Sequence, residues 1–170
     1  MHTSDDNRSG ASRHSAVGRE LAISLPDEAA TAVFAARLAK NLTPGLVIYL
    51  RGDLGAGKTT LVRALLNALG YQGRVKSPTY TLLEHYEIAG LSLRHFDLYR
   101  FRDASEWETA GFSDEFNGVN ICLLEWPEQA ACSVPTADVE IIFEILPEGR
   151  NISLHAHTDT GNKCLNSLYK

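Results

Sequence analysis

The sequence predicts an α/β domain of three layers built on a mixed parallel and antiparallel sheet. Two continuous apolar runs, 46–50 (LVIYL) and 119–125 (VNICLLE), are typical of parallel strands that are covered on both faces. Segments with helical spacing lie before and after the first run. Two further pairs of strand-like segments are joined by short turn sequences, which indicates antiparallel hairpins.

The first half of the chain alternates strands with helices. A short strand is predicted at 21–25, and a helix over 26–42 has acids at its beginning and a lysine near its end. The buried strand 46–50 follows, and a second helix over 59–70 ends at Gly70. The apolar stripe of the first helix comprises Val33, Ala35, Leu38, Ala39 and Leu42.

The second half is richer in strands. Segments 81–88 and 91–101 flank Ala89 and Gly90, which predicts a hairpin. A charged, helical connection over 103–116 leads to the buried strand 119–125. Segments 138–146 and 151–157 alternate apolar and polar residues around the turn sequence PEGR, so a second hairpin is expected near the C-terminus.

Length and composition indicate one globular domain. The chain has 170 residues with 44% hydrophobic and 22% charged residues. We expect a disordered tail at 1–19, a folded domain at 20–158, and a C-terminal segment 159–170 that either forms one more helical turn or frays. The net charge of −5 argues against a DNA-binding surface. Three widely spaced cysteines and the absence of a long apolar run favour a cytoplasmic protein without membrane attachment.

The segment from Gly52 to Thr59 matches the phosphate-binding pattern G-x-x-x-x-G-K-[ST] between a predicted strand and a predicted helix. Glycines let backbone N–H groups point at phosphates, and the helix N-terminus adds a positive dipole. Lys58 is expected to reach the β- and γ-phosphates, and the Thr59 hydroxyl to bind Mg²⁺. The candidate nucleotide-binding residues of this P-loop NTPase-like domain are Asp53, Leu54, Gly55, Ala56, Gly57, Lys58, Thr59 and Thr60.

ATP is preferred to GTP as the nucleotide. The guanine-reading pattern N-K-x-D has one partial match, at Asn162, and it places Leu165 where the aspartate is required.

Two acids compete for the metal. Glu125 directly follows the more apolar strand, as expected of an acid beside a phosphate loop. Asp97 follows a strand whose alternation indicates half exposure, so we expect it to polarise the attacking water or to support the metal from its outer shell. A helix cap or a salt bridge to Arg100 is the alternative role for Asp97.

The segment KSPTYT at 76–81 lies between the phosphate-loop helix and the first hairpin. In many phosphate-loop proteins a hydroxyl from such a segment senses the γ-phosphate and Mg²⁺, and Thr79 and Thr81 are candidates. Pro78 keeps Ser77 extended. The alternative is a turn that only leads into the next strand.

Four motifs in this order, GDLGAGKTT, VKSPTYTL, HFDLYR and CLLEWPE, resemble the bacterial TsaE (YjeE) ATPases over residues 21–157. The resemblance implies a subunit of the tRNA threonylcarbamoyladenosine (t6A) system that hydrolyses ATP weakly alone and works with TsaB- and TsaD-like partners. Contact with tRNA is then indirect, through the complex.

The resemblance also assigns roles to residues. It implies that Lys58, Asp97 and Glu125 are catalytic and that Thr59 and Glu125 bind Mg²⁺. Trp126 falls on a tryptophan beside the bound ATP or ADP. The adenine pocket is expected near Glu28 and Arg150, which lie in the corresponding regions without a motif around them.

Two other functions fit the residues. Arg100 and Arg102 could clamp a transferred phosphate, which would suit a small-molecule kinase. A nucleotide-gated binding protein without meaningful hydrolysis is the other alternative.

Overall fold

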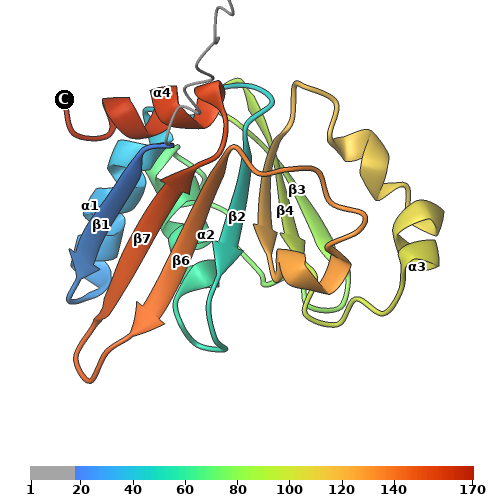
Figure 1. Ribbon diagram of the computed structural model, residues 1–170, viewed down its shortest axis with the longest axis horizontal. Helices are drawn as coiled ribbons and strands as arrows, with labels where there is room; N and C mark the ends of the chain where they lie inside the picture. The colour runs from blue at the N-terminus through green and yellow to red at the C-terminus, as the bar shows by residue number, and fades with distance from the viewer. Residues whose placement is uncertain (1–17) are drawn as a thin grey trace, which may run out of the picture.

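The computed structural model describes residues 18–170, in which a seven-stranded sheet has the order β1-β7-β6-β2-β5-β4-β3 (Figure 1). The disordered tail predicted at 1–19 therefore lies almost wholly outside the described residues. The strands are β1 (Glu20–Leu25), β2 (Val47–Arg51), β3 (Leu83–Ile88), β4 (Leu91–Asp97), β5 (Ile121–Glu125), β6 (Val139–Ile145) and β7 (Arg150–Ala156).

The centre of the sheet is parallel and its two sides are antiparallel. β2 pairs in parallel with both β5 and β6, which confirms the two apolar runs as central strands. β7 runs antiparallel to β1 and β6, and β3 runs antiparallel to β4. Ala89 (φ 54°) and Gly90 (φ 73°) both have positive φ, as a tight hairpin turn requires, so the predicted hairpin is confirmed.

The half-exposed strand predicted before Asp97 is wrong. β4 lies inside the sheet, between β3 and β5, and pairs in parallel with β5. His95 and Phe96 are completely buried, and Asp97 is 6% exposed. Alternation suggested exposure because the face opposite Leu91, Leu93 and His95 carries the polar Ser92 and Arg94, but both are only partly exposed and Arg94 is ion-paired with Glu87 and Glu115.

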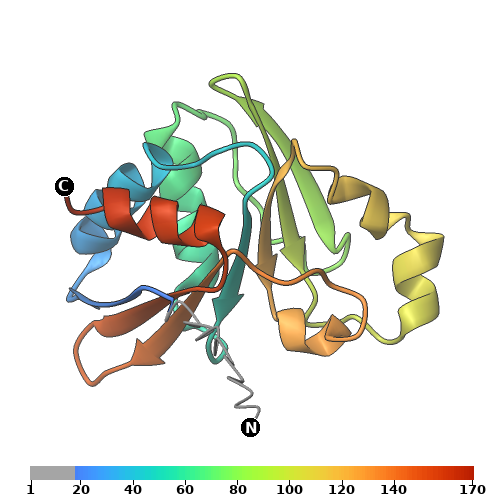
Figure 2. The same ribbon diagram turned by 45° about the horizontal axis from the view of Figure 1, so that its top comes forward.

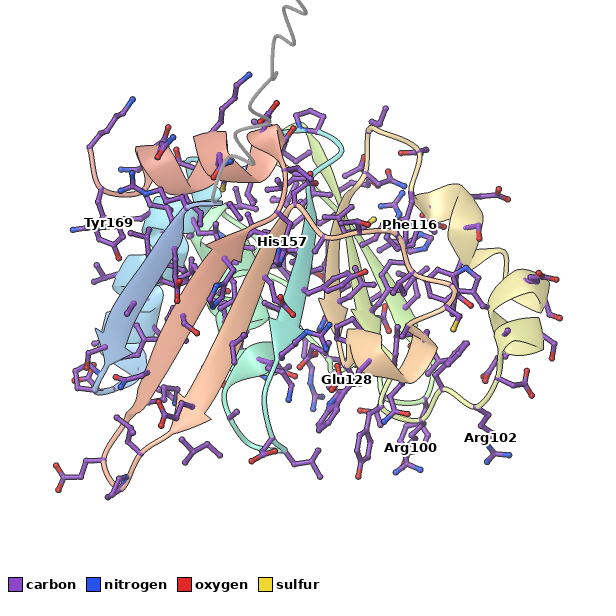
Figure 3. The ribbon with its side chains drawn as sticks, viewed as in Figure 1. Arg100, Arg102, Phe116, Glu128, His157 and Tyr169 are labelled. Carbon is purple, nitrogen blue, oxygen red and sulfur yellow. The ribbon has the colours of Figure 1, made fainter. Side chains whose placement is uncertain are left out.

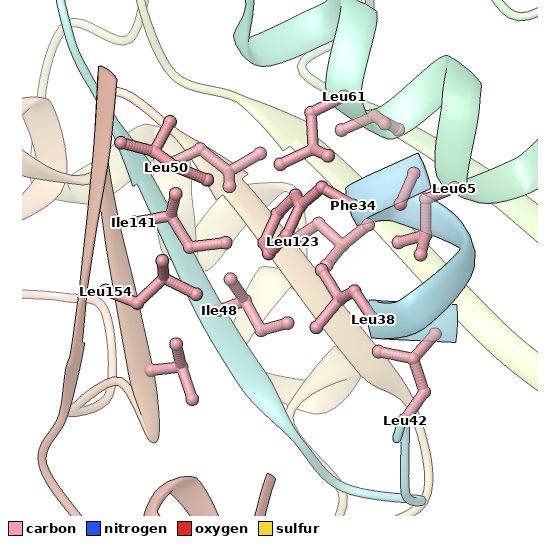
Figure 4. Close-up of a cluster of buried hydrophobic side chains, with 14 of the residues drawn as sticks. Phe34, Leu38, Leu42, Ile48, Leu50, Leu61, Leu65, Leu123, Ile141 and Leu154 are labelled. Atoms are coloured by element: carbon pink, nitrogen blue, oxygen red, sulfur yellow. The ribbon is translucent and has the colours of Figure 1, made fainter. Parts of the chain in front are cut away.

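Three of the four α-helices in residues 18–170, the first, second and last along the chain, cover one face of the sheet and make the larger of two apolar clusters with it. The helices are α1 (Glu28–Ala39), α2 (Lys58–Ala68), α3 (Ala104–Thr109) and α4 (Asp159–Ser167). Figure 4 shows Phe34 and Leu38 of α1 packed against Leu65 of α2 and Ile48 of β2. Val33, predicted for the buried stripe of α1, is 58% exposed, and Phe34 takes its place in the core.

The opposite face of β2, β5 and β4 carries an aromatic cluster. Phe96 of β4 stacks on Trp107 of α3 with ring centroids 6.1 Å apart and meets Phe112 edge-on at 5.4 Å. Phe112 begins a short 3₁₀ helix (Phe112–Glu115) that completes the predicted helical connection. α3 and this 3₁₀ helix therefore form the third layer, which Figure 2 shows beyond the β4 side of the sheet.

The C-terminal segment forms α4, and its side chains belong to the core. Cys164, Leu165 and Leu168 are at most 5% exposed and pack in the same cluster as α1 and α2. Residues 159–168 are therefore part of the packed structure. Within residues 18–170, no helix is both long and apolar enough to cross a membrane.

Candidate active site

The candidate active site lies at the carboxyl ends of β2, β5 and β4, where the loop between β2 and α2 projects below the sheet (Figure 1). This loop borders a cavity of about 420 Å³. Gly57 has φ 109°, a backbone conformation that strains any residue with a side chain, and its Cα faces the guanidinium of Arg150. The cavity is lined by Leu54, Gly55, Ala56, Gly57, Lys58, Thr59, Thr60, Ser77, Thr79, Asp97, Tyr99, Arg100, Glu125, Trp126 and Arg150.

Lys58 is the first residue of α2 and is only 5% exposed. Its ammonium donates to the carbonyl oxygens of Gly52 and of Asp53 (3.0 Å to the latter) and lies 4.1 Å from the ring centroid of Trp126. Burial lowers the pKa of Lys58, and the nearby carboxylates, Glu125 first among them, oppose this shift. The cation is thus held by neutral groups and is free of a direct ion pair within the described residues.

Glu125, at the end of β5, is 2% exposed and is bound to Thr59. The Thr59 hydroxyl lies 2.9 Å from Oε1 and 3.1 Å from Oε2 of the Glu125 carboxylate. Oε2 also lies 2.7 Å from Nε2 of the completely buried His95. A carboxylate and a hydroxyl are therefore held in contact beside the phosphate loop.

Asp97 is the neighbour of Glu125 in the register of β4 and β5, so both acids emerge at the same edge of the sheet. Its Oδ1 accepts from the backbone N–H of Tyr99 at 3.1 Å. Its Oδ2 accepts from the hydroxyls of Ser77 (3.1 Å) and Thr79 (3.4 Å). Asp97 thereby connects the 76–81 segment to the cavity.

Trp126 follows Glu125 directly and has a left-handed backbone, with φ 57° and ψ 48°. This conformation is costly for a bulky residue and is typical of functional sites. It brings the indole over Lys58 and to 5.0 Å from the ring of Tyr99, measured between centroids. The residue therefore forms one wall of the cavity.

Of the other predicted residues, some border the main cavity and some lie outside it. Arg150 donates to the carbonyl of Ala56 at 2.7 Å and so lies on the phosphate loop. Glu28 lines a second cavity of about 420 Å³ between α1 and α2, which shares Thr60 with the first. Arg100 lines the main cavity and Arg102 does not, and Figure 3 shows both at the end of the molecule that carries Glu128.

Two of the alternatives above can be compared with the geometry. Asp97 is not ion-paired to Arg100 within residues 18–170, because the guanidinium of Arg100 lies over the ring of Tyr80, 4.8 Å from its centroid. The hydroxyl of Thr81 contacts Glu84 at 3.4 Å, and Thr81 is not among the residues that line the cavity, whereas Thr79 is.

Three contributors to the site escaped prediction: Ser77, His95 and Tyr99. Ser77 was noted only as the residue before Pro78. His95 was assigned to a strand face without a role, although a histidine at the second position before an acid on a strand shares the face of that acid. Tyr99 contributes a backbone N–H, for which a sequence carries no signal.

A parallel strand, a glycine-rich loop and a helix, with acids at the ends of neighbouring strands, define a nucleotide-binding protein of the P-loop α/β class. A family model described as "Threonylcarbamoyl adenosine biosynthesis protein TsaE" matches residues 25–152. The chain belongs to the TsaE family.

Relatives and a solved structure agree with this assignment. The chain is 44% identical over 149 residues to the tRNA threonylcarbamoyladenosine biosynthesis protein TsaE of Haemophilus influenzae, covering 85% of this chain and 94% of the relative. The TsaE protein of Rickettsia felis is 34% identical over 129 residues, covering 75% of each chain. The crystal structure of Bacillus subtilis YdiB superposes with a TM-score of 0.76 at 27% identity, covering 89% of this chain and 95% of YdiB.

Proposed function

We propose that this protein hydrolyses ATP with Mg²⁺ in the cavity at the phosphate loop and thereby supports the synthesis of t6A in tRNA together with TsaB- and TsaD-like partners. One observation carries the hydrolytic part. Glu125 and Asp97 end adjacent parallel strands in register, so two carboxylates with different hydrogen-bond partners face the same phosphate cradle. Because tRNA is its indirect target, we place this reaction in the cytoplasm.

Phosphate recognition is assigned to the loop and to Lys58. The residues at the start of α2 line the cavity, where their N–H groups would bind phosphate, as in other phosphate loops. The Lys58 ammonium is held by two carbonyl oxygens and by the face of Trp126. Since none of these groups carries a formal charge, a phosphate oxygen is a stronger partner and should draw the ammonium away from them.

The residues present fit a magnesium ion. Thr59 and Glu125 supply hard oxygen donors that already touch each other. No group of three or more His, Cys, Asp or Glu side chains in residues 18–170 is arranged to hold a metal by itself. Mg²⁺ commonly takes one or two protein ligands and fills its shell with water and phosphate oxygens. When bound, it would neutralise negative charge on the phosphates.

Asp97 is assigned to the attacking water. Its carboxylate is held in place by the backbone N–H of Tyr99 and by two hydroxyls that can rotate. A carboxylate fixed in this way can orient a water molecule and accept its proton, which contributes roughly 10²- to 10⁴-fold to a rate. If the hydroxyls of Ser77 or Thr79 turn to a γ-phosphate, their hydrogen bonds to Asp97 are lost. The 76–81 segment would therefore respond to the state of the nucleotide.

The base of the nucleotide is assigned from the positions of the main cavity and of the cavity between α1 and α2. Arg150 lies on Ala56 and Gly57, which favours a contact with phosphate over a contact with adenine. The cavity between α1 and α2 shares Thr60 with the phosphate site and has Glu28 in its wall. We assign the base to this cavity, beside Glu28.

The test is reconstitution with partners. The purified protein should bind ADP and ATP with Mg²⁺ and hydrolyse ATP slowly. Addition of TsaB- and TsaD-like proteins and tRNA should accelerate ATP consumption and yield t6A, measured by mass spectrometry of digested tRNA. Lys58→Ala should abolish both effects. If the partners change neither ATP consumption nor the modified nucleoside, the proposal is wrong.

A kinase activity would use the same cavity. Arg100 borders it, but Arg102 lies outside, so the paired arginine clamp expected of such an enzyme is not formed. Transfer of labelled γ-phosphate to a panel of nucleosides and metabolites distinguishes the two functions, because the proposed ATPase transfers phosphate to water alone.

A further inference from the structure

We propose that His95 is a positioning residue that fixes Glu125 for Mg²⁺ and keeps Lys58 available for phosphate; this rests on the proposed function of Glu125 as a metal ligand. His95 lies in the interior of the sheet on β4 and has no exposed surface. Its Nε2 lies 2.7 Å from Oε2 of Glu125. Its Nδ1 is buried without a hydrogen-bond partner.

The direction of the hydrogen bond follows from the partners. Both oxygens of Glu125 lie within 3.1 Å of the Thr59 hydroxyl, as suits an ionised carboxylate that accepts. Nε2 of His95 must then carry a proton and donate it to Oε2. Nδ1 is left as a bare lone pair, which is less costly to bury than an N–H without an acceptor.

A packing role alone does not account for this histidine. On the β5 side His95 pairs in register with Leu123, and Leu93 and Phe96 of its own strand are completely buried. On the β3 side it pairs in register with Glu84, but neither ring nitrogen is hydrogen-bonded to that residue. A leucine in this place would satisfy the core and leave no buried polar atom unpaired. Retaining a ring with one unpaired buried nitrogen destabilises the fold, so the compensating gain lies in the contact with Glu125.

The contact prevents a competing pair. Glu125 is 2% exposed, and among the carboxylates near the buried Lys58 it is the one that attracts the ammonium most strongly. A carboxylate without the His95 donor would gain most by swinging onto Lys58, which would occupy the phosphate lysine and the metal ligand together. By donating to Oε2, His95 holds Glu125 on Thr59 while Lys58 rests on neutral carbonyl oxygens.

Two amide variants separate this role from packing. In His95→Gln the side-chain NH₂ can reach Oε2 from a position close to that of Nε2, whereas in His95→Asn the same group is one methylene too short. The matched control is His157, whose Nε2 lies 3.0 Å from Glu140 but which is exposed at another part of the sheet (Figure 3). His157→Gln and His157→Asn should behave as wild type.

The experiment measures ADP affinity by calorimetry with EDTA and with saturating Mg²⁺, and the thermal unfolding of each variant. For His95→Asn, the gain in affinity caused by Mg²⁺ should fall by about 10- to 100-fold, as expected when the partner of a metal ligand is lost. Affinity in EDTA should change by less than about threefold. His95→Gln should recover most of the Mg²⁺-dependent gain.

The outcomes separate the inference from the function on which it rests. If wild type shows no Mg²⁺-dependent gain, or if Glu125→Gln retains it, the metal site itself is wrong. If wild type gains and Glu125→Gln loses the gain, but His95→Asn keeps it, only the role of His95 is overturned. Equal losses in His95→Gln and His95→Asn also overturn it, because the reach of the donor then has no effect. If His95→Asn fails to fold, His95→Leu takes its place. The inference is supported if His95→Gln keeps the Mg²⁺-dependent gain and His95→Leu loses it, and it is overturned if both variants keep the gain or both lose it.

Discussion

Replacing Asp97 by asparagine tests whether the site hydrolyses ATP through a carboxylate or only binds nucleotide. Asp97 accepts from the N–H of Tyr99 with one oxygen and from Ser77 and Thr79 with the other. An asparagine keeps an oxygen for Tyr99, and its NH₂ group can donate to the two hydroxyls after they rotate. The substitution therefore removes a negative charge and preserves the pattern of hydrogen bonds.

The expected effects on folding and on catalysis differ in size. Folding loses the charge assistance of two hydroxyl contacts, one of them long at 3.4 Å, which amounts to about 1 kcal/mol. Hydrolysis loses a general base worth roughly 10²- to 10⁴-fold, or about 3–5 kcal/mol in the activation free energy. ADP affinity should stay within about threefold. Single-turnover ATP hydrolysis with the partners present, calorimetry with ADP, and urea unfolding measure the three quantities.

The control is Asp114→Asn, which removes the same charge from an exposed position on the 3₁₀ helix and should leave all three quantities unchanged. Asp97→Asn that still hydrolyses ATP within threefold of wild type would show that Asp97 is not the base. Retained t6A synthesis without hydrolysis would favour the nucleotide-gated binding protein. A parallel loss of ADP affinity and rate would instead assign Asp97 to binding.

Three further predictions follow from the same geometry. Trp107→Phe removes the hydrogen bond from the indole to Ser113 (2.8 Å) and part of the aromatic core, so urea unfolding should show a loss of about 2 kcal/mol, while the remaining tryptophan should still report ADP binding by fluorescence. Arg150→Ala should weaken binding of both ATP and tripolyphosphate about tenfold in calorimetry, whereas Glu28→Ala should weaken ATP about threefold and leave tripolyphosphate unchanged. Because burial lowers the pKa of Lys58 in the folded state, the unfolded chain binds more protons between the two pKa values. The nucleotide-free protein should therefore gain stability relative to Lys58→Met as the pH rises toward the ordinary lysine pKa of 10.5, and a difference that stays constant or falls would contradict this sign.

Hydrophobic periodicity predicted the strands well where burial of apolar side chains alone determines them. The apolar runs of β2 and β5 are buried on both faces, and hydrophobic burial alone specifies such strands. β4 was misjudged because Ser92 and Arg94 on one of its faces indicated exposure to solvent, whereas Arg94 is mostly covered and ion-paired with Glu87 and Glu115. A periodicity counts polarity and cannot register that a polar group is satisfied inside the protein.

Parts of the site could likewise be predicted from sequence and parts could not. The phosphate loop could be predicted because its chemistry lies in consecutive residues from Gly52 to Thr59. Arg150 follows the loop by more than 90 positions and reaches it only because β7 pairs with β6, which in turn pairs with β2. Contacts of this kind depend on the order of strands in the sheet, which local sequence does not determine.

The order of strands also explains why two acids can have two roles. β4 lies next to β5 in parallel register, so Asp97 and Glu125 end level with each other at the edge that faces the phosphate loop. Equal acids at one place would repel each other, yet each has its own donors: Thr59 and His95 for Glu125, and backbone with hydroxyl groups for Asp97. The separate donors hold one carboxylate on Thr59, at the proposed metal position, and the other beside the 76–81 segment proposed to sense the γ-phosphate.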